Sequence, residues 1–444
     1  MIRLYSILLS AIFIPLASAG QQVTRLSLND CIDYALKHNY TIKNAAIDVL
    51  IQQAQNNETV AAAYPHINAK LELDDYLNPQ QSLIDGKYLG MPGTTEKFAF
   101  TLPYGGSGSI NATQVVFDGA VLIALKARKT VMEFARQNSA VTEEGIRYNI
   151  FKAYNSLVIA YRQYDIVKNS LSYARGLEHD ITVTQQNGFA EKIDVERTSV
   201  QVNNLATDSI RIGNLLTVSE EVLKYQIGMD IKTPIVLTDT LVDQRKQDAV
   251  DLLLQEKKYD RIPEYILSQT SLTLNEFNLK RYQLEAWPTV NAFGGMGYNY
   301  PSTNFNQIFV FPNYLFNSAI GLQVNIPIFN GLLRKNQVTE AKLNVEKSKN
   351  TIENVKQTID FQEAQARTSL KNAILETQSQ HRNLELATDV LDLARRKYKA
   401  GVGSNLEVTQ AQTDQLSAQT NYFNALLDII NAEADLKKAL GLLK

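Results

Sequence analysis

The sequence predicts a mainly helical protein in which long helical hairpins are combined with four short amphipathic strands. Three observations support this fold class. Proline, the strongest helix breaker, is absent from residues 104–233 and 328–444. Within these windows, apolar and small side chains recur at alternating steps of four and three residues, the period of a left-handed coiled coil. Before the long helices, short segments alternate between apolar and polar residues, which is typical of strands with one apolar face.

Residues 1–19 are predicted to be a signal peptide. Arg3 supplies the positive charge, a short apolar run follows, and small residues at 17–19 form a cleavage motif. An N-terminal membrane anchor is the alternative, but the apolar run is too short to span a bilayer. The mature chain is expected to begin near Gly20. Cys31, the only cysteine, lies too far from that point to carry a lipid anchor.

The first half of the mature chain begins with a helix and two strands. In the first strand, the odd positions from Ile67 to Leu73 are apolar and the even positions are polar. The elements expected here, in chain order, are a helix over 28–63 capped by Ser27 or Asn29, a strand over 66–74, a long loop over 75–106, a strand over 109–117, a helix of about seventy residues, a turn at Gly188 and a return helix of about forty residues.

The second half repeats this order of elements. The alternation is sharpest over 318–329, where every even position from Ile320 to Ile328 is aliphatic. The expected elements are a helix over 251–285 kinked near Pro263, strands over 289–300 and 318–329 joined by an aromatic loop over 301–316, a second long helix, a turn at Gly401 and Gly403, and a second return helix.

The chain is predicted to be two copies of one unit. With an offset of 213 residues, the heptad register, the turn sequences and the glycines at 228 and 441 coincide. We expect a first repeat over 20–228, a connector over 229–250 and a second repeat over 251–444. Two copies are too few for a solenoid, so a closed pseudo-symmetric assembly is the better expectation.

Composition and motifs argue against two function classes. The net charge is −2 and the pI about 6.2, whereas a nucleic-acid-binding protein usually has a basic footprint. The four histidines are scattered, and no zinc-protease, nucleophile-elbow or Walker A motif occurs. The glycine-rich stretches at 104–108 and 293–297 lack a following Lys-Ser/Thr and fit strands better. We therefore expect no enzyme activity, no cofactor and no metal site.

Four strands are too few to close a membrane barrel, because the two outer strands would leave backbone N–H and C=O groups unpaired in lipid. If the apolar face meets lipid, several chains must contribute strands to one sheet. Three chains give twelve strands, an even number that suits a closed barrel. The alternative is a small soluble sheet attached to a coiled-coil rod.

The chain resembles the TolC outer-membrane efflux proteins along essentially its whole mature length. The resemblance is carried by the opening Leu26–Ile32 segment, by Ala-Tyr-Pro at 63–65 and Ala-Trp-Pro at 286–288, by Phe-Asp-Gly at 117–119 and Phe-Asn-Gly at 329–331, and above all by the two turn sequences at 187–195 and 398–408. It implies a trimeric twelve-stranded barrel on a periplasmic α-helical barrel, an outer-membrane location with a periplasmic extension, an inner-membrane transporter and a periplasmic adaptor (membrane fusion) protein. The adaptor would dock on the turns, at Asn187, Gly188, Phe189, Gly401 and Val402.

The resemblance also implies a gate at the closed end of the helical tunnel. Tyr398 and Asp194 match the family's gate tyrosine and aspartate, whereas Gly403 occupies the position of its gate arginine, so the charged clamp cannot form. We expect a hydrogen bond from the Tyr398 hydroxyl to Asp194 in its place. Glu407 matches an acidic constriction, in which Gln410 replaces a second carboxylate. Asp194 and Glu407 also suit the N-terminal turns of helices on electrostatic grounds alone.

Two function classes remain open from the sequence. The first is a passive export duct, with small-molecule or drug efflux favoured over type I protein secretion. The second is a structural or adhesive coiled-coil surface protein. A duct should form conducting pores in a planar bilayer, whereas a rod should not.

Overall fold

The structure is a computed structural model that describes residues 24–239, 245–309 and 314–443. The predicted signal peptide lies outside the described residues. The chain divides into two compact units. We call them the helical unit, formed by Met1–Ala46, Ala140–Ile262 and Gln357–Lys444, and the sheet unit, formed by Ile47–Ser139 and Pro263–Lys356.

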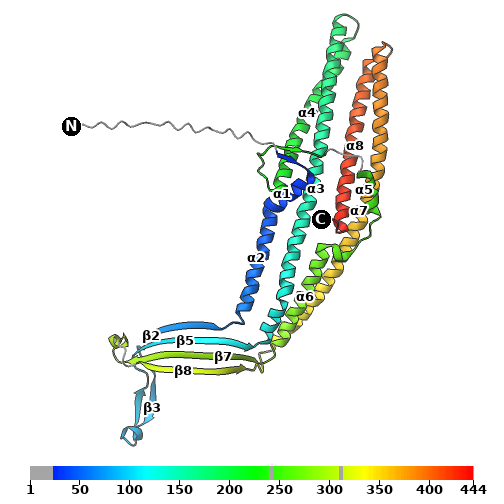
Figure 1. Ribbon diagram of the computed structural model, residues 1–444. Coiled ribbons are helices and arrows are strands. Elements are labelled where there is room, and N and C mark those ends of the chain that lie inside the picture. Colours follow the sequence, from blue (N-terminus) through cyan, green and yellow to red (C-terminus); the bar gives the residue numbers. More distant parts are fainter. Residues whose placement is uncertain (1–23, 240–244, 310–313, 444) are drawn as a thin grey trace, which may run out of the picture. The chain divides into compact units, whose positions relative to one another are not determined.

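Two long hairpins supply most of the helical residues of the described chain (Figure 1), and the lengths of their helices confirm the prediction. The first consists of α3 (Gly119–Gln186, 68 residues) and α4 (Lys192–Ile227, 36 residues). The second consists of α7 (Leu333–Lys399, 67 residues) and α8 (Asn405–Ala439, 35 residues). In the helical unit, small and branched residues of α7 and α8 form one buried cluster, which includes Ala366, Leu370, Ala373, Ile429, Ala432 and Leu436. The heptad rows therefore bury the seam within this hairpin.

The helix predicted over 28–63 is two helices, α1 (Leu28–His38) and α2 (Tyr40–Ala61). The break lies at Asn39, which has an extended backbone (φ −63°, ψ 126°). Its side-chain oxygen accepts hydrogen bonds from the amides of Thr41 and Ile42, and its amide donates to the Gln226 carbonyl at 2.7 Å. Asn39 thus caps the first turn of α2 and ties it to α4. Ser27, not Asn29, caps α1.

A parallel pair of three-residue strands escaped the sequence prediction. β1 (Thr24–Leu26) pairs with β6 (Ile235–Leu237), which lies in the predicted connector. The Tyr154 hydroxyl donates to the Leu26 carbonyl at 3.2 Å. Below this pair, Cys31 is fully buried in a core formed by α1, α3 and α4.

The sheet unit contains four antiparallel strands in the order β2-β5-β7-β8 (Figure 1). The alternation predicted the four strands but not their order. Their bounds are His66–Asp75, Tyr104–Phe117, Thr289–Ser302 and Leu315–Asn325. The register aligns Ile67, Ala112, Gly294 and Ile320 in one row of a single face. This apolar face is open: Leu71 is 88% and Ile320 92% exposed. Among the described residues, β2 and β8 each pair on one side only.

Two loop predictions need correction. The segment 75–106 contains a hairpin of β3 (Gln81–Asp85) and β4 (Thr95–Ala99) joined by the short helix η1 (Gly86–Leu89). The loop between β7 and β8 contains η3 (Phe305–Phe309). The turn residues there made the sequence look irregular throughout, although short strands need only five residues each.

The helix predicted over 251–285 is also interrupted. It comprises α5 (Arg245–Leu253), an irregular segment with η2 (Tyr259–Arg261), and α6 (Pro263–Leu284). Pro263 is the first residue of α6 rather than the site of a kink. Proline suits that position because the first N–H of a helix has no intrahelical acceptor, so its absence costs no hydrogen bond.

Candidate functional site at the helix tips

The turn of each hairpin is closed by the same backbone motif. Gly188 and Gly401 have left-handed backbones, with φ of 80° and 75°. The Gly401 amide donates to the Tyr398 carbonyl, and the Val402 amide to the Lys397 carbonyl; the amides at 188 and 189 donate in the same pattern. This is the Schellman cap, which needs a left-handed residue at the glycine position. The two predicted tip glycines are therefore explained by geometry.

The residues that follow the two glycines are the most exposed apolar side chains of the turns. Phe189 is 85% exposed and Val402 is 76% exposed. The Asn187 side-chain amide donates to the Val183 carbonyl at 2.8 Å, so it helps to end α3. Each tip thus presents one exposed apolar side chain directly after its cap.

Gly403 is required by close packing rather than by a left-handed backbone. Its amide donates to the Lys397 carbonyl at 3.2 Å. A Cβ atom at this position would lie 2.9 Å from Lys397 Cβ and 3.0 Å from the Tyr398 amide nitrogen. Any larger residue, an arginine included, would have to shift the end of α7. The turn is therefore built for glycine at the position where the family resemblance implies the arginine of a charged clamp.

Tyr398 and Asp194 lie in one neighbourhood, but they are not hydrogen-bonded. The Tyr398 ring is half-buried against an apolar cluster that includes Ile181 and Val408. Burial raises the pKa of the Tyr398 phenol, and the nearby Asp194 carboxylate raises it further. Within the described part of this chain, the expected hydrogen bond from the Tyr398 hydroxyl to Asp194 is not formed. Their coupling is electrostatic, and the ring contributes mainly through apolar contacts.

Glu407 is paired, a feature that the sequence analysis missed. It lies in the first turn of α8, where its amide donates to the capping Ser404 hydroxyl at 3.2 Å. Its carboxylate lies 3.6 Å from the Lys397 ammonium. In the next turn of α8, the Gln410 amide donates to Asp414 at 2.9 Å. The signal for this ion pair in the sequence was a lysine ten residues before Glu407, on the other side of the turn.

An open groove lies beside this ion pair, between α7 and α8. Its volume is about 420 Å³. Exposed apolar side chains form part of its lining, and charged groups flank them. The lining includes Val390, Leu393, Leu406, Lys397, Glu407 and Asp414.

The two hairpins contact each other near the tips through polar side chains that were also missed. Asn405, the first residue of α8, reaches the first turns of α4. One turn before Tyr398, the Arg395 guanidinium stacks 3.8 Å above the Tyr173 ring of α3. Further along α8, the Gln412 amide donates to the Ser170 carbonyl at 3.3 Å. Asn405, Gln412 and Gln419 recur every seven residues beside the alanine row, and this polar row was the signal in the sequence.

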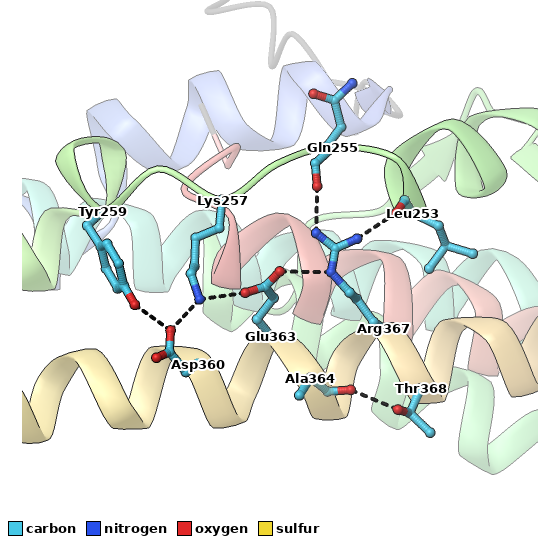
Figure 2. A network of polar contacts seen from close by, with 9 residues as sticks. All are labelled: Leu253, Gln255, Lys257, Tyr259, Asp360, Glu363, Ala364, Arg367 and Thr368. Carbon is cyan, nitrogen blue, oxygen red and sulfur yellow. Dashed lines mark hydrogen bonds and ion pairs between the residues drawn. The ribbon is translucent and has the colours of Figure 1, made fainter.

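A separate polar network anchors the segment after α5 to α7 (Figure 2). Lys257 pairs with Asp360 and, at 2.6 Å, with Glu363. Arg367 donates to Glu363 at 2.8 Å and to the carbonyls of Leu253 and Gln255. Burial opposes the charged form of Glu363, but the hydrogen bonds from Lys257 and Arg367 outweigh it and lower the pKa of Glu363.

For Lys257, burial and hydrogen bonding also oppose each other, but their effects on the pKa have the opposite signs. Burial lowers the pKa of Lys257, but the hydrogen bonds to Asp360 and Glu363 outweigh it and raise the pKa above its usual value. The network therefore holds its charges over a wide pH range.

None of the helices in residues 24–239, 245–309 and 314–443 has a stretch both long and apolar enough to cross a bilayer. No group of three or more His, Cys, Asp or Glu side chains there is arranged to hold a metal ion.

The family model for outer membrane efflux proteins matches residues 283–442. The probable outer membrane lipoprotein SilC of Salmonella typhimurium is 24% identical over 95% of this chain and 86% of its own length. The cation efflux system protein CusC of Escherichia coli is 24% identical over 92% of this chain and 85% of its own. Among solved structures, the outer membrane protein VceC of Vibrio cholerae superimposes with a TM-score of 0.71 at 18% identity, covering 93% of this chain and 96% of that one.

Proposed function

Since the chain belongs to the outer membrane efflux protein family, whose members are TolC-like, we propose that three copies form a passive duct through the outer membrane. The protein is located in the outer membrane, as its relatives are. Those relatives are channels rather than enzymes. Substrates would enter from an inner-membrane pump and leave through the duct without chemical change.

One observation carries this proposal: among the described residues, the β2-β5-β7-β8 sheet is apolar on one face, and its outer strands β2 and β8 have no partner on their free sides. Lipid cannot satisfy the free N–H and C=O groups of an edge strand. Three sheets joined edge to edge would satisfy them all and form a twelve-stranded barrel. The face that carries Leu71 and Ile320 would then meet lipid, while the opposite face, with Asn68, Ser109 and Asn111, would line the lumen.

The helical hairpins would form the periplasmic part of the duct. We place the docking surface for a periplasmic adaptor on Phe189, Val402 and the adjoining groove between α7 and α8. Exposed apolar side chains on rigid caps support this role, because they lose little conformational freedom on binding. Tyr398, Asp194 and Gly403 would form the gate region, and Glu407 a constriction beside it.

The favoured cargo is small molecules such as drugs. Cation efflux is the second candidate, because CusC is named for a cation efflux system and matches most of this chain. Type I protein secretion remains a third, and a structural coiled-coil protein of the cell surface is the alternative to a duct.

Three measurements test the proposal. Purified protein should be a trimer that needs detergent, and it should form conducting pores in a planar bilayer. A deletion strain should become more sensitive to a drug panel, with the wild-type gene restoring resistance. Sensitivity to metal cations alone would favour cation efflux, and loss of one secreted protein would favour secretion. A soluble monomer without pore activity contradicts the duct and favours the rod.

A further inference from the structure

One buried side chain connects the first turns of α8 and α4. Asn405 is only 5% exposed. Its side-chain amide nitrogen lies 3.3 Å from the Asp194 carbonyl oxygen and 3.1 Å from the Thr198 hydroxyl oxygen. Thr198 is fully buried, and its hydroxyl donates to the same Asp194 carbonyl at 2.8 Å. The Asn405 amide, the Asp194 carbonyl and the Thr198 hydroxyl thus bond to one another, with little access to water.

The orientation of the Asn405 amide follows from its partners. A carbonyl oxygen can only accept, so the nitrogen of Asn405 must face Asp194. Its oxygen points to its own helix, where Thr409 Oγ1 lies at 3.4 Å. The Asn405 side chain therefore donates from α8 to α4.

The contact joins the two hairpins rather than the helices of one hairpin. Asp194 and Asn405 are separated by 211 residues. The apolar seam between α7 and α8 keeps the second hairpin together, whereas the Asn405 contact must part whenever the tips of the two hairpins separate. A buried hydrogen bond from a side-chain amide contributes only modestly to the stability of the closed contact, because water replaces it once the seam opens.

We propose that Asn405 is the latch that holds the closed tips together in this protein. The latch rests on the proposed duct function, and it explains how the gate closes where Gly403 leaves no charged clamp. It differs from the predicted Tyr398–Asp194 bond because it uses the backbone of Asp194 rather than its carboxylate. Asn405 is a positioning residue: it sets the distance between α4 and α8 and touches no cargo.

The test is the isosteric change Asn405→Asp, measured in planar bilayers. The carboxylate keeps the size of the amide and suits the first turn of a helix, but it cannot donate to the Asp194 carbonyl. The ratio of open to closed time should rise at least about fivefold, the effect of one lost hydrogen bond of ordinary strength. Asn424→Asp is the matched control, because Asn424 makes an exposed contact from α8 to Gln163 of α3, and it should leave this ratio unchanged.

A second variant acts from the other side of the contact. Thr198→Val removes the hydroxyl without changing the shape, and it should also favour the open state. If both changes act through one contact, the double variant should open no more than Asn405→Asp alone. Pores of Asn405→Asp that match wild type, or full additivity in the double variant, overturn the latch. Wild-type protein that forms no pores contradicts the duct itself, so the two failures are distinguishable.

Discussion

The Lys397 ammonium of α7 lies 3.6 Å from the Glu407 carboxylate of α8, across the turn that Gly401 closes. Both side chains are about half exposed, so the pair contributes little to stability. Its main effect is electrostatic, because each charge partly cancels the electric field of the other at the tip. The acidic constriction expected from Glu407 is thus partly neutralised within each chain.

Lys397→Ala should increase the cation preference of the pore, because it frees the Glu407 carboxylate. Glu407→Gln should decrease the preference, because it leaves the lysine alone. Reversal potentials in a salt gradient measure both effects, and high salt should weaken them. Lys399→Ala, two residues along, serves as the charge-matched control. Equal reversal potentials for all variants would place this pair outside the ion path.

Tyr398→Phe should change conductance and open time little, because the hydroxyl is not bonded to Asp194 within the described chain. Tyr398→Ala should favour the open state, since it removes a half-buried ring from the apolar cluster near Ile181. Single-channel recording compares the two variants. A large effect of Tyr398→Phe would show that the hydroxyl bonds to a group in a neighbouring copy.

Phe189→Asp combined with Val402→Asp should abolish efflux while leaving trimers in the membrane. The reason is that both side chains are exposed and make few contacts within the chain, so charge there affects docking rather than folding. Drug susceptibility measures the first outcome and native gel migration the second. Phe189→Leu with Val402→Ile keeps both tips apolar and should stay active. Normal resistance in the double aspartate variant removes the tips from the docking role.

Glu363 should stabilise the protein at neutral pH and lose this effect in acid. Its folded pKa is lowered, so its contribution is complete above the unfolded value of about 4.3 and fades as the pH falls through the folded value. Glu363→Gln should cost roughly 1.5–3 kcal/mol at pH 7. Thermal unfolding in detergent at several pH values measures the difference between variant and wild type. A difference that does not shrink below pH 4 contradicts this assignment.

Lys257, which belongs to the same network, should show the opposite dependence of stability on pH. Because its folded pKa is raised, its contribution is complete below the unfolded value of about 10.4 and disappears as the pH rises through the folded value. Lys257→Met should therefore lower the unfolding temperature equally at pH 6 and pH 9. The loss should become smaller only in strong alkali. A marked change between pH 6 and pH 9 would show that another group titrates in the network.

The sequence predicts the elements that long regular patterns define. The proline-free windows locate α3, α4, α7 and α8, and strict alternation locates the four strands of the sheet. Both patterns span many residues, so local irregularities average out. Breaks of one residue are harder to see: Asn39 interrupts a helix because it caps the next one, and this depends on a contact with Gln226 of α4.

At the tips too, the features set by local sequence were predictable and those set by tertiary contacts were not. Gly188 and Gly401 were recognisable, because a left-handed cap favours one residue type. The ion pair of Lys397 with Glu407 and the contact of Asn405 with Asp194 were not, because they depend on how two helix ends meet in space. The trimer and the gate remain predictions, since they concern contacts between copies of the chain, which a single chain does not contain. The duplication also remains a prediction.

The parallel pair of β1 and β6 has a consequence for the order of events during export. The first described residues form their backbone bonds with a strand about two hundred positions later, and the Leu28 amide likewise donates to Asp239, 211 residues away. A chain that crosses the inner membrane from its N-terminus delivers β1 long before its partner arrives. The N-terminal segment must therefore wait, unpaired, until β6 has crossed. Closing so long a loop is costly in entropy, so we expect this pairing to be a late step of maturation.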